Sequence, residues 1–197
     1  MSKRIVLFLA MFLTAVTGIV MWHVPTMSRQ HYLNSQEDLL ESLTWYLAGR
    51  DGENNITPLH VIERELGISS IGIINIDSIN LRLPVKSGVD YYTINIAPGW
   101  VEETARIGEL GNAVIAGHRN YTFGEMFNRL GEIVIGDIIE IQTTDGLMQF
   151  EVFEKTVIEP TDQIAFLQPL NDVVITLYTC TPIEISSHRL IIRAILI

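Results

Sequence analysis

Cys180 is the only cysteine in this chain of 197 residues, and its surroundings favour chemistry at the thiol. The apolar, β-branched run 173–176 leads into it, and a second apolar run, 190–192, follows a short polar stretch. This pattern predicts a thiol near the end of a buried strand, close to the start of its neighbour. A thiolate is a nucleophile, and the guanidinium of Arg189 would suit an anionic group beside it. The other interpretation is a small core side chain, because free cysteine is among the most buried residue types.

Two further groups would complete acyl-transfer chemistry at a cysteine. His118 follows the apolar run 113–116 and a glycine, so its imidazole is expected at a strand end. There it could protonate a leaving amine and later deprotonate an incoming one. Arg189 offers a fixed fork of N–H groups for a substrate carbonyl or an oxyanion. The hydroxyl of Thr179 and the backbone N–H of Thr181 could assist.

Each of these groups also has a purely structural interpretation. A histidine at a strand end is often a hydrogen-bonded structural residue, and an arginine near a C-terminus is often a solvated charge. His188 competes with His118 as the base, but adjacent strand residues point to opposite faces, so His188 and Arg189 should not both enter one site. Zinc on Cys180 and the two histidines is a further alternative, although no CxxC or HxxxH spacing supports it. No metal or cofactor is expected, and no phosphate loop or GxSxG elbow is present.

The N-terminus carries a membrane signal. Lys3 and Arg4 precede the uncharged, mostly apolar run 5–22, which is at the lower length limit for a spanning helix. The basic start predicts a cytoplasmic N-terminus and an extracytoplasmic remainder. A cleaved signal peptide is the alternative, but residues 21–23 offer no small-residue cleavage site, so we interpret 1–23 as an uncleaved anchor. A lone cysteine outside the cell cannot form an internal disulfide, and the net charge of −10 argues against a nucleic-acid partner.

The rest of the chain divides into a helical segment and a β-rich domain. Helical spacing at 37–47 and 59–66 predicts two helices within a segment, 24–69, that is either a spacer or a lid over the active site. Seven or eight short strands in 70–197 point to a closed or nearly closed β-barrel. The expected elements are strands at 71–77, 81–85, 113–116, 138–143, 147–158 and 173–176, a short helix at 125–130 and a loop at 159–172.

Three separated motifs resemble those of the sortases, the cysteine transpeptidases of Gram-positive bacteria. They are Ala116-Gly117-His118-Arg119, Thr176-Leu177-Tyr178-Thr179-Cys180 and His188-Arg189-Leu190. The resemblance covers about 71–194 and implies an eight-stranded sortase barrel with His118, Cys180 and Arg189 as the catalytic trio. It implies cleavage of an LPXTG-like sorting signal between Thr and Gly through a thioacyl intermediate on Cys180. An amine, from a cell-wall precursor or a pilin lysine, would then resolve this intermediate at the outer face of the cell membrane.

The motifs are similar to those of both class C and class D sortases. Segment 24–70 lacks the Asp-Pro-aromatic lid motif of class C, and no second apolar anchor precedes Ile197. We expect the 159–172 loop to line the substrate groove, with apolar contacts for the Leu-Pro part of the signal from Ile158, Pro160, Ile164 and Phe166. Two other functions stay open: a cysteine hydrolase that uses water as the acceptor, and a non-catalytic, membrane-tethered β-barrel binding module.

Overall fold

The computed structural model describes residues 29–122, 124–166 and 171–197 and divides the chain into two units, 1–35 and 36–197. In the first unit the described residues, 29–35, are helical. The predicted anchor at 5–22 lies outside the described residues. Within the described ranges, no helix is long and apolar enough to cross a membrane.

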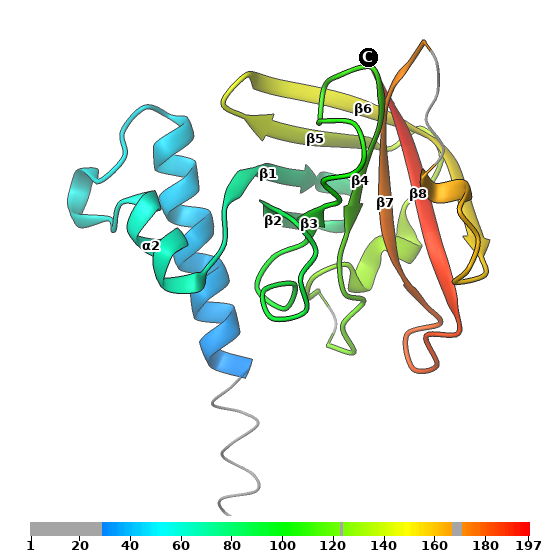
Figure 1. The fold of residues 1–197 in the computed structure, drawn as a ribbon, viewed down its shortest axis with the longest axis horizontal. Helices are drawn as coiled ribbons and strands as arrows, with labels where there is room; N and C mark the ends of the chain where they lie inside the picture. The colour runs from blue at the N-terminus through cyan, green and yellow to red at the C-terminus, as the bar shows by residue number, and fades with distance from the viewer. Residues whose placement is uncertain (1–28, 123, 167–170) are drawn as a thin grey trace, which may run out of the picture. The chain divides into compact units, whose positions relative to one another are not determined.

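Eight strands of the second unit form a closed barrel, which confirms the fold expected from the sequence (Figure 1). Their order around the barrel is β1-β2-β3-β4-β7-β8-β6-β5. The pairs β2–β3 and β4–β7 are parallel, and the other described pairs are antiparallel. The strands are β1 Ser70–Ile76, β2 Leu81–Ser87, β3 Gly99–Trp100, β4 Gly111–Ala116, β5 Ile138–Thr143, β6 Gly146–Ile158, β7 Val173–Thr181 and β8 His188–Leu196.

Alternation along the strands sorts side chains between the barrel interior and its outer face. On β7, Ile175 and Leu177 join the main core, whereas Tyr178 packs in a separate cluster outside the barrel. On β8, Leu190 and Ile192 likewise face inward, and Ile191 faces outward. This alternation predicts that a residue two positions beyond Tyr178 also lies on the outer face.

Two helices pack on the barrel wall at β1. The end of the first helix at 47 matches the expected range, but the chain is already helical at 29, the first described residue, so the expected start at 37 was wrong. The second helix, α2, Leu59–Leu66, matches its expected range, and Gly67 ends it in a left-handed conformation. Their apolar faces form one cluster with β1 and with the 88–98 loop. Its buried members are Leu39, Leu43, Leu59, Ile62, Ile73, Ile96 and Ala97.

Two other local expectations were wrong. The 125–130 helix is instead a 3₁₀ helix, η3, at Asn128–Glu132, because Met126 adopts a φ of 47° that interrupts a regular helix before it. The side chains of Met126, Phe127 and Leu130 are nevertheless buried, as expected. The sequence also did not predict β3, whose two residues are too few to produce a periodic pattern.

Candidate active site

The thiol and the guanidinium singled out in the sequence lie directly opposite each other on neighbouring strands. Cys180 on β7 pairs with Arg189 on β8 in antiparallel register. Directly opposed residues have Cβ atoms about 5 Å apart and side chains on the same face. The alternation of β7 places this pair on the outer face of the barrel, where Cys180 is partly exposed. β7 ends one residue beyond Cys180, so the thiol lies near the end of a strand, as the sequence predicted.

His118 reaches the same level from the other side of β7. Ala116 pairs with Tyr178 in parallel register, and the N–H of Gly117 donates to the Tyr178 carbonyl at 3.1 Å. Continuing this register by two residues brings His118 beside Cys180. We infer that the three residues form one row with the cysteine in the middle, because His118 follows β4, Cys180 lies on β7 and Arg189 lies on β8. Segments far apart in sequence build this row because β4 and β7 are parallel neighbours (Figure 1).

Two close contacts hold the turn that carries His118. A Cβ at Gly117 would lie 2.8 Å from the ring of Phe127 and 3.1 Å from Pro98, so only glycine fits there without displacement. The N–H of Phe127 donates to the His118 carbonyl at 3.0 Å. The imidazole is half-buried, and this burial lowers the pKa of His118 below its ordinary value of 6.5. It is therefore neutral at neutral pH unless a nearby thiolate forms.

Thr179 fixes β7 to the same turn. Its buried hydroxyl donates to the carbonyl of Gly117 at 2.7 Å, which ties the strand of Cys180 to the residue before His118. A hydroxyl committed in this way faces away from the thiol, so its contribution is to position the histidine. The support of the oxyanion or substrate that the sequence suggested for Thr179 stays a prediction.

Arg119 links the two sides of the row. Its Nη1 donates to the hydroxyl of Thr181 at 2.7 Å, and its Nε donates to the Asn128 carbonyl at 3.2 Å. Burial lowers the pKa of Arg119 from its ordinary value. The Thr181 hydroxyl thus accepts a hydrogen bond from Arg119. The backbone N–H of Thr181 remains the group that could donate to an oxyanion.

Arg189 and His188 point to different surroundings, as strand alternation requires. The Arg189 Nη1 donates to the carbonyls of Ser186 at 3.1 Å and His188 at 2.9 Å, and these bonds do not use its Nε or Nη2. The Nε2 of His188 lies 3.1 Å from a carboxylate oxygen of Glu159, and its Nδ1 lies 2.8 Å from the hydroxyl of Ser187. Both ring nitrogens of His188, the alternative to His118 as the base, thus have partners other than Cys180 and Arg189.

Of the four predicted groove residues, Ile158 lies beside Arg189, and the other three follow it on the 159–172 loop. Ile158 pairs with Arg189 across β6 and β8, so both side chains lie on the outer face. Ile158 is buried with Ala165 and Ile191, and Phe166 contacts the ring of Tyr178 with centroids 5.7 Å apart. Pro160 and Ile164 are exposed on the same loop. Their role in a substrate groove stays a prediction.

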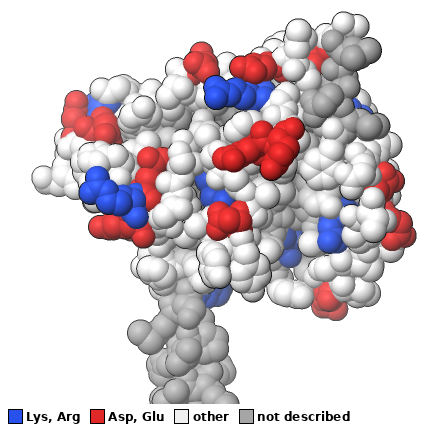
Figure 2. Space-filling view, viewed as in Figure 1, with Lys and Arg blue, Asp and Glu red and all other residues white. Residues whose placement is uncertain are grey.

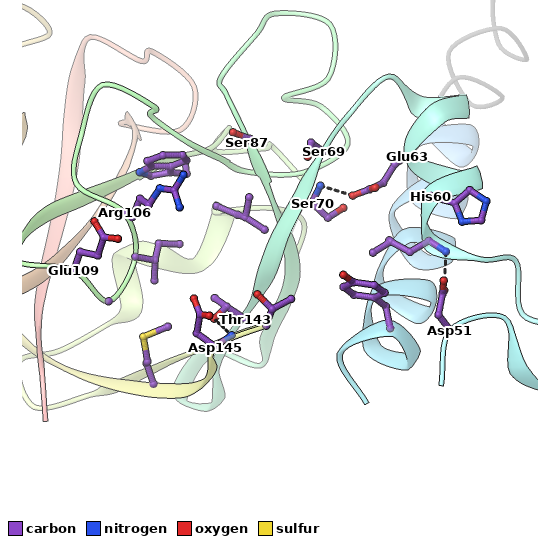
Figure 3. A pocket seen from close by; sticks show the side chains of 18 residues that line it. Asp51, His60, Glu63, Ser69, Ser70, Ser87, Arg106, Glu109, Thr143 and Asp145 are labelled. Atoms are coloured by element: carbon purple, nitrogen blue, oxygen red, sulfur yellow. Dashed lines mark hydrogen bonds between the residues drawn. The ribbon is translucent and has the colours of Figure 1, made fainter. Parts of the chain in front are cut away.

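A hollow of about 720 Å³ lies at the other end of the barrel. Figure 3 shows Arg106 and Glu109 on its barrel side and Glu63, whose carboxylate accepts from the Ser70 N–H at 2.6 Å, on α2. None of its lining residues belongs to the row of Cys180, so this cavity is not the candidate active site. In the described ranges no group of three metal-ligating side chains occurs.

Sequence reasoning missed Tyr178 and Arg119 as parts of this site. Tyr178 is two residues from Cys180, so the period of a strand would have placed it on the same face. Arg119 stands in a quoted motif, but its contact with Thr181 depends on the fold of the 119–127 loop. Charged side chains of both signs are interspersed on the face in Figure 2, without a continuous basic surface.

Comparison with known proteins identifies the family. A model described as the sortase domain matches residues 74–197, and the chain therefore belongs to the sortase family. Sortase D of Bacillus subtilis (strain 168) is 30% identical over 112 residues, which cover 56% of this chain and only 54% of that protein. The chain thus matches about half the length of this relative.

Solved structures of sortases share the fold. Clostridium perfringens Sortase D5 transpeptidase superposes with a TM-score of 0.66 at 28% identity, covering 83% of this chain and 99% of that chain. Streptococcus agalactiae sortase C1, in complex with MTSET, gives a TM-score of 0.63 at 30% identity, covering 66% and 70%. Both classes expected from the motifs are represented.

Proposed function

We propose that this chain is a membrane-anchored cysteine transpeptidase that cleaves an LPXTG-like sorting signal and joins the released acyl group to an amine. The observation that carries the proposal is the row formed by His118, Cys180 and Arg189 on the outer face of the barrel. It provides a nucleophile, a proton carrier and a cation within reach of one carbonyl group. Membership of the sortase family supports the same chemistry.

The reaction proceeds in two acyl transfers. The Cys180 thiolate attacks the carbonyl carbon of the signal's threonine, and the N–H groups of Arg189 stabilise the oxyanion. The C–N bond breaks as His118 gives a proton to the leaving amine, which leaves a thioester on Cys180. An incoming amine then attacks the thioester and passes its proton to His118, the C–S bond breaks, and Cys180 leaves as the thiolate.

For the acceptor, we propose an amine from a cell-wall precursor or from a pilin lysine. A solved structure of Streptococcus pneumoniae Sortase C, 30% identical to this chain, is described as giving insight into pilin substrate specificity. Similarity to sortases of both classes keeps both amines as candidates.

For the location, we propose that residues 1–23 anchor the chain, with the barrel outside the cell. The basic start followed by the apolar run 5–22 supports this orientation. We further propose that the 24–69 segment is a spacer and not a lid. The apolar faces of its helices at 36–47 and 59–66 pack on β1 and the 88–98 loop, and β1 is not adjacent to β7 or β8 in the barrel. The bond from Gln36 to the Met126 sulfur reaches the loop after His118, but it is made from the first residue of the second unit.

For the substrate groove, we propose that Phe166 and Ile158 contact the Leu-Pro part of the signal. Phe166→Asp should raise the KM for the peptide several-fold, because it places a charge on the apolar surface beside Tyr178. Phe166→Leu, which keeps the surface apolar, is the matched control. Equal KM values for the two variants would remove Phe166 from the groove.

The proposal is tested with sorting-signal peptides and a panel of amines, followed by mass spectrometry of the products. Ligation that disappears in Cys180→Ala supports the transpeptidase. Cleavage that is unaffected by any amine favours the hydrolase instead. Absence of any Cys180-dependent product would favour the binding module.

A further inference from the structure

The four most exposed large apolar or aromatic side chains among the described residues lie on loops at the end of the barrel that carries Cys180 and His118. In the described part of the chain, the most exposed large apolar or aromatic residues are Tyr92 (82%), Tyr91 (81%), Tyr121 (74%) and Ile185 (72%). They lie on three loops, 88–98, 119–127 and 182–187, which Figure 1 shows at the lower end of the barrel. The second loop follows His118 directly, and the third joins β7 to β8. We call these four residues the aromatic rim.

The loop that carries two of these tyrosines is held in a fixed shape. The ammonium of Lys86 is fully buried and donates to the Gly88 carbonyl at 2.6 Å and to Asp90 at 2.9 Å. Asp90 in turn accepts from the backbone N–H groups of Tyr92 at 3.1 Å and Thr93 at 2.9 Å. The two rings therefore point into solvent from a braced loop. An exposed aromatic pair presented this way is more typical of a contact surface than of a collapsed loop.

Two of the three loops that carry the aromatic rim contact the start of the second unit. Gln36, the first residue of this unit, donates through Nε2 to the Ile96 carbonyl at 2.8 Å and to the Met126 sulfur at 3.2 Å. These acceptors belong to the 88–98 and 119–127 loops. In the sequence, Gln36 follows the end of the apolar run at Trp22 by fourteen residues. Even a fully extended chain of that length spans no more than about 50 Å.

We propose that the aromatic rim docks the catalytic end of the barrel on the outer surface of the lipid bilayer. This inference rests on the anchor in the proposed function. Tyrosine rings are favoured at the boundary between lipid tails and headgroups, where the ring is in contact with apolar chains and the hydroxyl stays hydrated. Docking holds Cys180 close to the membrane, where a substrate that is itself embedded in the membrane presents its sorting signal.

The charge of the chain determines the type of lipid contact. The net charge of −10 opposes attraction to anionic headgroups, and the four rim residues are uncharged. On the face shown in Figure 2, charged side chains of both signs lie on the lower part of the barrel, and Asp90 and Glu184 lie on the rim loops themselves. The docking is therefore expected on neutral phosphatidylcholine bilayers and should change little with salt.

The test uses the full chain in phosphatidylcholine nanodiscs, with a spin label as the reporter. The label is attached at Tyr92→Cys in the Cys180→Ala background, and the control label is attached at Leu110→Cys, an exposed position at the opposite end of the barrel. We expect lipid-soluble oxygen to relax the label at 92 more than a water-soluble nickel chelate does, with the reverse at 110. Equal exposure of both labels to water overturns the proposal. A label at 92 that stays in water and becomes immobile only when substrate protein is added assigns the rim to a protein partner and also overturns it.

A kinetic experiment separates the docking from the chemistry. The variant Tyr91→Ser/Tyr92→Ser/Tyr121→Ser should lose activity several-fold on a sorting signal fused to a membrane-spanning segment, but not on the same signal as a soluble peptide. Leu110→Ser/Leu147→Ser, at the other end of the barrel, should change neither rate. Equal losses on both substrates would contradict the docking. Inactivity of the unmodified chain on soluble peptide would contradict the proposed chemistry, while the label readout would still decide the docking. A chain that does not stay with the bilayer contradicts both the anchor and the docking.

Discussion

Replacing Thr179 with valine should separate the position of His118 from the stability of the barrel. Valine has nearly the shape of threonine but cannot donate to the Gly117 carbonyl, which the Thr179 hydroxyl meets at 2.7 Å. Removing one partner of a buried hydrogen bond costs about 1–3 kcal/mol. For a domain of this size, each 1 kcal/mol lowers Tm by about 2–4 °C. Thr179→Ser, which keeps the hydroxyl, is the matched control.

The substitution should also slow catalysis. The lost bond joins the strand of Cys180 to the turn of His118, so the two groups can shift relative to each other. A displacement of about 1 Å in such a pair costs up to ~10²-fold in rate. We expect kcat for ligation of a soluble peptide to fall at least about tenfold in Thr179→Val, with KM nearly unchanged. Thr179→Ser should keep most of the activity. A Thr179→Val variant with lowered Tm but the kcat of Thr179→Ser would refute this account of the histidine's position.

Three other predictions follow from single contacts. Arg189→Lys should lose about 10²-fold in kcat, nearly as much as Arg189→Ala. A single ammonium cannot both replace the bonds to the Ser186 and His188 carbonyls and face an oxyanion. An acylation rate near that of the unmodified chain would contradict this. Burial lowers the pKa of His118, so this histidine binds a proton at a higher pH in the unfolded chain than in the folded chain. The free energy of unfolding should therefore fall as the pH decreases below about 6.5. Urea titrations should show a shallower fall for His118→Gln, and an identical pH dependence would exclude this histidine as the cause. Asp90→Ala should lower the urea midpoint more than Lys86→Met does, because the Asp90 variant leaves the fully buried Lys86 ammonium without its carboxylate partner. The opposite order would show that the Lys86–Asp90 pair does not hold the loop in shape.

The barrel and its register could be predicted to the extent that they depend on local pattern. The strands expected at 138–143 and 147–158 are present as β5 and β6, which pair antiparallel across a short turn. The β-branched run before Cys180 marked β7 correctly, although the strand continues to Thr181. These features depend on neighbours in sequence, which is why the sequence contains them.

The parts that could not be predicted depend on contacts between distant segments. The bond from Thr179 to Gly117 and that from Arg119 to Thr181 exist only because β4 and β7 are parallel neighbours. Threonine inside a strand gives no sign that its hydroxyl will meet a particular carbonyl. The position of Met126 at a positive φ, which moved η3 beyond its expected start, likewise follows from the packing of the 119–127 loop.

The central claim is that Cys180 carries the acyl group between the signal and the amine. The most direct measurement is the intact mass of the protein after brief mixing with a sorting-signal peptide in the absence of amine. The account predicts a mass increase equal to the acyl fragment that ends at the signal's threonine. The adduct should disappear when amine or hydroxylamine is added, and Cys180→Ala should not form it. Amine-ligated product without any such adduct, or an adduct that persists in Cys180→Ala, would contradict the account.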